Sequence, residues 1–235
     1  MNNWLNIIQN KCLPSRCMFC GQPGLGDMDL CPACLNELPR NASCCYRCAE
    51  PFASPMPAPQ LCGRCLTKPP GFDETHAPYL YDDGLRFLIT RLKFNRQFKH
   101  ARLLGTLLAR YLADNVELAE CIIPVPLHPK RYRERGFNQS IEIARHLAEQ
   151  LALPMDVDSC MRHRDTAHQT DLAAKQRRRN MRQAFSVKHA PAYRHVAIVD
   201  DVMTTGATAA ALAETLRKQG VSRVDVWVCA RAGSI

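Results

Sequence analysis

Two carboxylates stand directly before a run of threonines and a glycine near the C-terminus. Asp200 and Asp201 follow the apolar stretch 196–199, which reads as a buried strand, and the turn after it opens a helix. Backbone N–H groups and hydroxyls at such a helix start can bind a phosphate. The acids could accept hydrogen bonds from sugar hydroxyls and support a magnesium ion. We therefore predict a sugar-phosphate site, with the phosphate held by Thr204, Thr205, Gly206, Ala207 and Thr208.

An ordinary strand–turn–helix is the alternative explanation of this stretch. Two adjacent carboxylates beside a buried strand would be costly without a ligand, because a charge loses hydration when it is buried. We expect the acids to lie in the turn and to bind the sugar, while the loop binds the phosphate.

Cysteine spacing indicates a second kind of chemistry. Ten of the thirteen cysteines precede residue 66, and eight of them form four C-x-x-C pairs. Two such pairs supply the four thiolates of a tetrahedral zinc site, so we expect two structural zinc ions. The predicted ligands are Cys17, Cys20, Cys31, Cys34, Cys45, Cys48, Cys62 and Cys65.

Several features of this cysteine-rich segment stay open. The pairs could combine sequentially, as two stacked ribbons, or they could interleave. A redox C-x-x-C and a single metal site with spare thiols are the other interpretations. Cys12 and Cys44 are left over, and Cys44 could replace Cys45 as a ligand.

The elements that must position these residues follow from the pattern of the remaining chain. The Pro- and Gly-rich segment 67–79 marks a boundary near residue 70, so we predict domains at 1–68 and 69–235. Strands are expected at 77–81, 121–126, 195–200 and 224–230, and helices at 84–94, 100–115, 138–153 (capped by Asn138) and 206–220. This alternation is typical of a doubly wound parallel α/β sheet with ligands at the strand C-terminal ends.

Charge and hydropathy bear on location and partners. The N-terminus lacks the basic start and apolar run of a signal peptide, and no stretch is long enough to span a membrane, so we expect a cytoplasmic protein. Residues 1–66 hold five Lys/Arg against four Asp/Glu, and residues 67–235 hold 26 against 18. Nucleic-acid affinity should therefore lie mainly on the second domain. Aromatic residues make up only 7% and give no sign of an extended base-stacking platform.

Three motifs resemble known families. The stretch VAIVDDVMTTGAT (196–208) resembles the phosphoribosyl pyrophosphate (PRPP) motif of type I phosphoribosyltransferases. The segments 124–140 and 162–185 are similar to signatures of the ComF family of bacterial competence and GntX-like DNA-utilisation proteins, and Leu92–Phe94 resembles its LK element. The matching positions are Pro124, Val125, Pro126, Arg135, Gly136, Phe137, Asn138, Gln139, Arg164, Thr166, Gln169, Leu172, Arg179, Asn180 and Phe185.

The resemblance implies a zinc module joined to a type I phosphoribosyltransferase fold. It implies PRPP with Mg²⁺ as the ligand, Asp200 and Asp201 as catalytic acids, and a role with single-stranded DNA in uptake or utilisation. Other DNA-uptake proteins are candidate partners. The alternative is an active phosphoribosyltransferase with an unidentified nitrogenous acceptor.

Basic residues of the two signature segments could bind the same ligand. For the pyrophosphate, or for a hood over the site, the candidates are Lys130, Arg131, Arg135, Arg164 and Arg179. A solvated basic surface is the alternative for each of them. The run Arg177–Arg179 is the candidate DNA contact.

Overall fold

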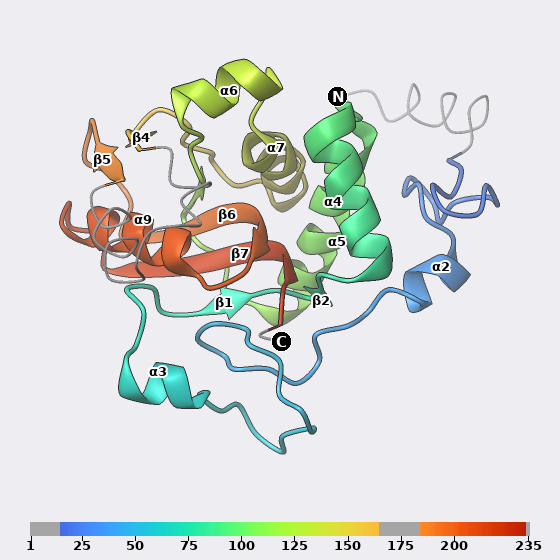
Figure 1. Ribbon diagram of the computed structural model, residues 1–235, viewed down its shortest axis with the longest axis horizontal. Coiled ribbons are helices and arrows are strands. Elements are labelled where there is room, and N and C mark those ends of the chain that lie inside the picture. The colour runs from blue at the N-terminus through green and yellow to red at the C-terminus, as the bar shows by residue number, and fades with distance from the viewer. Residues whose placement is uncertain (1–14, 165–183, 234–235) are drawn as a thin grey trace, which may run out of the picture.

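A five-stranded parallel sheet forms the centre of the molecule. The computed structural model describes residues 15–164 and 184–233 (Figure 1). The strand order is β1-β7-β6-β3, and β2 also pairs with β7. The strands are β1 (Thr75–His76), β2 (Tyr79–Leu80), β3 (Cys121–Pro124), β6 (His195–Met203) and β7 (Arg223–Arg231). Because β3, β6 and β7 are buried along almost their whole length, they read as nearly continuous apolar runs, as central parallel strands do.

Helices cover both faces of this sheet. α5 (Lys99–Asn115) and α7 (Gln139–Leu151) pack on one face, with α4 (Asp83–Asn95) against α5. The other face carries α9 (Ala207–Arg217) and the antiparallel pair β4 (Cys160–Arg162) and β5 (Phe185–Val187). The fold is therefore the doubly wound α/β fold that the sequence predicts.

Close packing of α5 on α7 places the start of α7 beside the end of β6. A Cβ added at Gly105 of α5 would lie 2.9 Å from the carbonyl oxygen of Ile143, so only glycine permits this approach. Asn138 caps α7 by accepting a hydrogen bond from the Ser140 N–H at 3.0 Å, which confirms the predicted cap. The same Asn138 donates to the carbonyl oxygen of Val125 at 2.9 Å, which ties α7 to the segment after β3.

One local feature differs from the sequence prediction. β6 does not end before the acids: it runs through Asp200 and Asp201 to Met203, because β7 offers backbone partners out to Arg231. The acids therefore lie on the strand, where successive side chains point to opposite faces, and the expectation that they lie in the turn was wrong. The basic segment after β3 forms α6 (Pro129–Arg135), with proline in its first turn and Gly136 as a left-handed cap.

Two cysteine-rich ribbons precede the sheet strands in the chain. The first ribbon contains the short helix α2 (Pro32–Asn36), and the second ribbon contains the short helix α3 (Gly63–Thr67). The first ribbon packs into the hydrophobic cluster of α4 and α5, and the second packs into the cluster that contains α9. Backbone hydrogen bonds join the ribbons to the sheet region, from Asn41 N–H to the Pro78 carbonyl at 2.9 Å and from Leu80 N–H to the Pro39 carbonyl at 2.8 Å. Within the described ranges, no helix has both the length and the apolar character that crossing a bilayer requires.

Candidate phosphoribosyl site and metal centres

The two acids at the end of β6 have different surroundings. Asp200 lines an open pocket beside the loop that follows the strand, and its Oδ1 accepts a hydrogen bond from Ser140 Oγ at 2.7 Å. Asp201 is 3% exposed and forms an ion pair with Lys93 Nζ of α4. The structure thus places Asp200 at the pocket and directs Asp201 toward α4.

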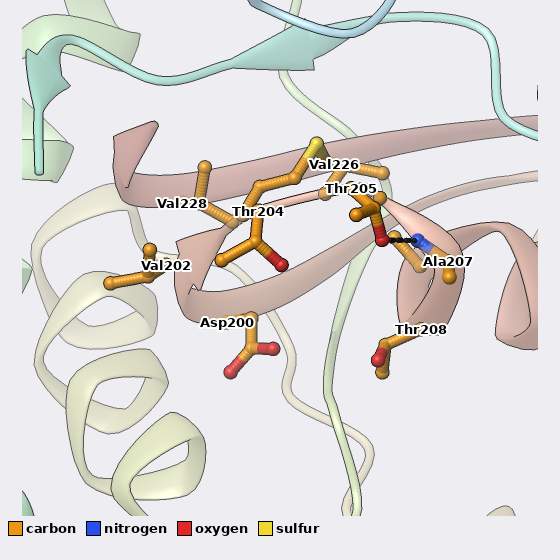
Figure 2. A pocket seen from close by; sticks show the side chains of 11 residues that line it. Asp200, Val202, Thr204, Thr205, Ala207, Thr208, Val226 and Val228 are labelled. Carbon is orange, nitrogen blue, oxygen red and sulfur yellow. Dashed lines mark hydrogen bonds between the residues drawn. The ribbon is translucent and has the colours of Figure 1, made fainter. Parts of the chain in front are cut away.

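The loop 204–208 lies next to Asp200, as Figure 2 shows. Gly206 has φ 75° and is the N-cap of α9, a left-handed conformation that favours glycine. Thr205 Oγ1 accepts a hydrogen bond from the Ala207 N–H at 3.3 Å (Figure 2). All five predicted phosphate ligands line the pocket, which holds about 330 Å³ of space, part of it open to solvent.

The surroundings of Asp200 shift its pKa upward. Burial and the neighbouring Asp201 together raise the pKa of Asp200 to about 7, and Ser140 and Lys93 oppose this rise. For Lys93, burial alone would lower the pKa, but the attraction of Asp201 outweighs burial and the pKa is raised. Lys93 therefore lies close enough to attract both carboxylates.

Among the basic residues predicted to bind pyrophosphate, the described structure links Arg135 to the acids. Arg135 at the end of α6 donates to Gln139 Oε1, and Gln139 Nε2 lies 3.5 Å from Asp201 Oδ1, so Arg135 belongs to the acid network. Burial lowers the pKa of Arg135, against the attraction of Asp201. Lys130 is exposed, and Arg131 forms an ion pair with Glu134 at 3.0 Å. Arg164 is exposed just beyond β4, while the run Arg177–Arg179 lies outside the described residues.

Sequence reasoning missed two contacts of the acids. Ser140 lies at the second position of α7 and points to Asp200, a role that the helix pattern does not reveal. Lys93 falls in the LK element, but its partner is more than a hundred residues away, on β6. One signal in the sequence could have identified Lys93. It is a cation beside the apolar face of α4, next to the buried Leu92 and one helical turn after the buried Ile89.

A buried arginine joins the second ribbon to the loop. The side chain of Arg231, at the end of β7, is 0% exposed and forms an ion pair with Glu50. Its Nε donates to the Cys48 carbonyl at 3.0 Å, and its Nη1 donates to the Met203 carbonyl at 3.2 Å. Met203 is the last residue of β6 and directly precedes the candidate phosphate loop. One guanidinium therefore contacts both the second ribbon and the residue before this loop.

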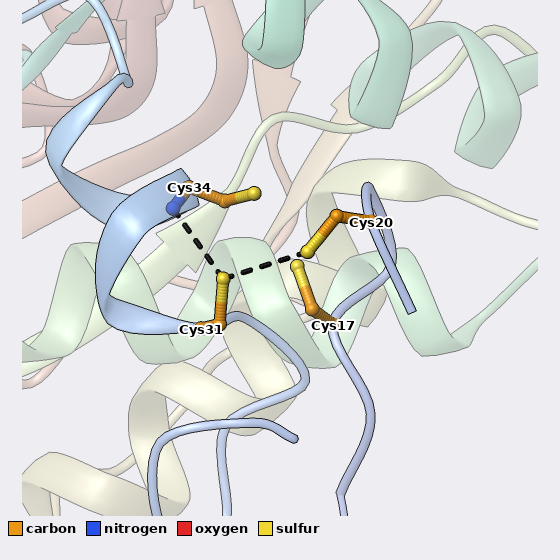
Figure 3. A group of neighbouring side chains, drawn as sticks. All are labelled: Cys17, Cys20, Cys31 and Cys34. Carbon is orange, nitrogen blue, oxygen red and sulfur yellow. Dashed lines mark hydrogen bonds between the residues drawn. The ribbon is translucent and has the colours of Figure 1, made fainter. Parts of the chain in front are cut away.

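The cysteine pairs combine sequentially into two four-thiol clusters. The first contains Cys17, Cys20, Cys31 and Cys34 (Figure 3), and the second contains Cys45, Cys48, Cys62 and Cys65. Within each cluster the sulfurs lie within 4.8 Å of one another. This settles the pairing that the sequence left open.

The thiol geometry fits zinc. Cys20 and Cys31 Sγ are 3.6 Å apart, and so are Cys48 and Cys62 Sγ, close to the separation of about 3.8 Å for sulfurs about 2.3 Å from a tetrahedral zinc. Burial raises the pKa of Cys17, but N–H groups of Cys31, Cys20 and Phe19 outweigh it and lower the pKa to about 6. Cys44 belongs to neither cluster, so its suggested role as a replacement ligand was wrong. The described residues thus contain two candidate zinc sites.

Comparison with known proteins gives the family. The double zinc ribbon domain matches residues 8–66, and the phosphoribosyl transferase domain matches residues 138–234. DNA utilization protein YhgH of Salmonella typhimurium is 35% identical over 226 residues, covering 93% of this chain and 98% of that protein. Competence protein F of Haemophilus influenzae is 36% identical over 226 residues, covering 92% and 97%. The chain belongs to the ComF family.

Both parts of the ComF-family arrangement can now be placed on the structure. The double zinc ribbon match contains all eight clustered cysteines, and the phosphoribosyl transferase match contains Asp200 and the loop after it. A glutamine PRPP amidotransferase from B. subtilis, solved with ADP and GMP, aligns with a TM-score of 0.38 and 22% identity over 55% of this chain and 25% of that one.

Proposed function

We propose that this ComF-family protein binds PRPP with Mg²⁺ in the pocket at the end of β6 and acts on single-stranded DNA during DNA uptake or utilisation. One observation carries the PRPP part: a carboxylate and a Thr/Gly loop line the same pocket at the carboxyl end of a parallel strand. In doubly wound sheets, ligands bind at this edge.

Each group in the pocket has a chemical task under this proposal. The N–H groups and hydroxyls of the loop hold the 5′-phosphate at the start of α9. Asp200 accepts hydrogen bonds from the ribose hydroxyls, and Mg²⁺ on those hydroxyls supplies the positive charge that favours the ionised carboxylate. Arg135, held by Gln139 near the acids, contacts the pyrophosphate.

The names of the relatives support the DNA part. Proteins called DNA utilization protein and competence protein F match almost the whole chain, both ribbons and sheet. The net charge of +9 is compatible with a polyanionic partner. We infer that the protein handles single-stranded DNA and uses PRPP as a bound regulator or co-substrate.

Calorimetry on the zinc-loaded full chain tests the PRPP part. We expect PRPP to bind with Mg²⁺, more weakly without it, and ribose 5-phosphate to bind more weakly still because it lacks the pyrophosphate. An Asp200→Asn variant should lose about 1–3 kcal/mol of binding free energy, the cost of charged hydrogen bonds. Equal affinity in the variant, or no binding by the native chain, would contradict the proposal.

An active transferase is the second candidate, and the match to the phosphoribosyl transferase domain favours it. In that case Asp200 would also stabilise positive charge on the sugar as pyrophosphate leaves C1′ and a nitrogen of the acceptor bonds to that carbon. Pyrophosphate release is the discriminating measurement. Repeated turnover with a nucleobase or amine establishes transfer, whereas PRPP binding without release leaves a binding protein.

A further inference from the structure

α4 carries a line of exposed aromatic and basic side chains on the side away from the core. Phe87, Arg91 and Phe94 are spaced four and three residues apart, so they share one face of the helix. Leu85, Leu88, Ile89 and Leu92 of the same helix are completely buried. Phe94 is 74% exposed and Phe87 is 40% exposed. Single exposed rings are common, but a row of them marks an interaction surface.

The row continues beyond the helix in both directions. At one end, the ring of Phe87 lies 5.9 Å from that of Phe19 in the first ribbon. At the other end, Phe98, which is 48% exposed, packs edge-on against Phe137 with 5.1 Å between the ring centroids. The Arg96 guanidinium lies beside the cap of α6, 3.3 Å from where a Cβ of Gly136 would be. Tyr132 of α6, 50% exposed, adds a further ring near this cap.

Positive charge accompanies the rings. Arg91 lies over the ring of Phe87, 5.2 Å from its centroid, in a cation–π contact. Arg96, Lys99, Lys130 and Arg133 are exposed, and within the described part of the chain none of these four forms an ion pair. The acid between them, Glu134, pairs with Arg131. We call the row of Phe87, Arg91, Phe94, Arg96, Phe98 and Tyr132 the aromatic–basic face.

We propose that the aromatic–basic face binds single-stranded DNA, with phosphates against the cations and bases stacked on the rings. Aromatic rings beside cations form the general single-strand binding surface, since every base has a flat face to stack. Phe87 and Phe94 are separated by about 10 Å along the helix axis, the span of three stacked nucleotides. A duplex keeps its bases stacked on one another and cannot use exposed rings in this way.

The face has a direct connection to the candidate phosphoribosyl site. Phe94 points out of α4, while the adjacent Lys93 points inward and pairs with Asp201. A strand on this face would therefore lie on the helix that supplies a cation to the acid pair. This inference rests on the DNA part of the proposed function and assigns that part a surface, which differs from the basic run 177–179.

Fluorescence anisotropy with a labelled oligothymidine tests the assignment on the zinc-loaded full chain. We expect Phe94→Ala and Phe98→Ala each to weaken binding about tenfold. The pair Arg96→Gln and Lys99→Gln should reduce the slope of log affinity against log salt by about 1.4, because two fewer phosphates are neutralised. Leu66→Ala, another exposed apolar residue, and Lys218→Gln, an exposed cation after α9, are the matched controls and should bind like the native chain.

The arms of this experiment separate the possible failures. Calorimetry with Mg²⁺–PRPP should give native affinity for all these variants, since none lines the pocket, so the PRPP proposal stands or falls independently. Oligothymidine binding that survives the ring substitutions would overturn the assignment, as would equal affinity for a duplex of the same length. Sedimentation showing a native dimer that Phe94→Ala dissociates would also overturn it, because a second copy would then cover this face.

Discussion

The guanidinium of Arg231 and the carboxylate of Glu50 form a buried ion pair between the last sheet strand and the second ribbon. Neither residue is a predicted ligand of zinc or PRPP. Yet the same guanidinium donates to the carbonyl of Cys48, a predicted zinc ligand, and to the carbonyl of Met203, which precedes the phosphate loop. The second metal centre and the candidate PRPP site therefore share one side chain.

This relationship predicts that the two sites are thermodynamically coupled. If zinc binding favours the Arg231 arrangement, PRPP binding must in turn favour zinc retention by the same factor. We expect saturating Mg²⁺–PRPP to raise the zinc affinity of the second ribbon, measured by equilibrium competition with a chelator, and to leave the first ribbon unaffected. A Cys17→Ser, Cys20→Ser variant isolates the second ribbon for this measurement. Equal zinc affinities with and without PRPP would show that the sites are independent.

Neutralising Glu50, the acid of the pair with Arg231, should lower the stability of the fold. Glu50→Gln leaves a buried guanidinium without its counter-charge, and we expect the free energy of unfolding to fall by about 3–5 kcal/mol. Urea denaturation measures this change. Glu37→Gln, on the first ribbon, is the control, since no ion pair of Glu37 occurs among the described residues. Similar stabilities for the two variants would remove the structural role assigned to Glu50.

The raised pKa of Asp200 predicts two pH dependences. Between its ordinary pKa of 3.8 and the folded value of about 7, the folded chain holds a proton at Asp200 that the unfolded chain has lost. The contribution of this group to stability therefore declines as pH rises through that window, and Asp200→Asn should remove the decline. Thermal unfolding at several pH values measures it.

Binding should show the opposite trend with pH. Under the proposed function Mg²⁺–PRPP binds the ionised carboxylate, so its affinity should increase as pH rises through about 7, with release of a proton. Calorimetry in two buffers of different ionisation enthalpy measures how many protons are released on binding. Because the ligand's own phosphate titrates nearby, the comparison with Asp200→Asn isolates the part due to the protein. An identical pH profile in the variant would contradict the assignment.

The pair Lys93–Asp201 is predicted to stabilise the fold through mutual compensation. Lys93→Met leaves the buried Asp201 without its cation and should cost about 3–5 kcal/mol. Asp201→Leu should cost less, because Asp200 remains close enough to attract the Lys93 ammonium. The double variant should lose much less than the sum, because both charges are gone. Additive losses in urea denaturation would show that the two residues do not interact.

Metal content should separate ligands from neighbours in the second ribbon. We expect two zinc ions in the native chain and one in Cys45→Ser, whereas Cys44→Ser should retain both because Cys44 lies outside the cluster. Elemental analysis of protein purified without chelator measures this directly. One zinc in the native chain, or an equal loss in the two variants, would contradict the assignment of ligands.

The local pattern of apolar residues was sufficient to predict most of the strands and helices. Strands β3, β6 and β7 are mostly apolar runs, and α5 and α7 have clear helical periodicity, so each element could be recognised without its neighbours. The C-x-x-C spacing likewise identified the eight clustered thiols. Their sequential pairing required the folded chain, because either pairing satisfies a tetrahedral metal.

Contacts between distant segments could not be predicted in this way. The length of β6 depends on β7, which pairs with Asp200 and with Val202 and Met203 beyond the acids. The ion pair of Lys93 with Asp201 and the position of Arg231 depend on tertiary packing. The low aromatic content gave no sign of a stacking surface, yet the fold gathers Phe87, Phe94 and Phe98 along one helix and the turn after it. The aromatic content of a sequence does not show whether the aromatic residues will gather on one surface of the folded chain.

The packing of the two ribbons into two different hydrophobic clusters has a consequence for the life of the protein in a cell. If each ribbon requires zinc for folding, as small metal-binding modules commonly do, a chain synthesised without zinc would leave both clusters incompletely covered at once. Chaperones and proteases act on such exposed apolar surface. The abundance of the working protein would then follow the cell's zinc supply, even though neither thiol cluster lines the candidate phosphoribosyl pocket.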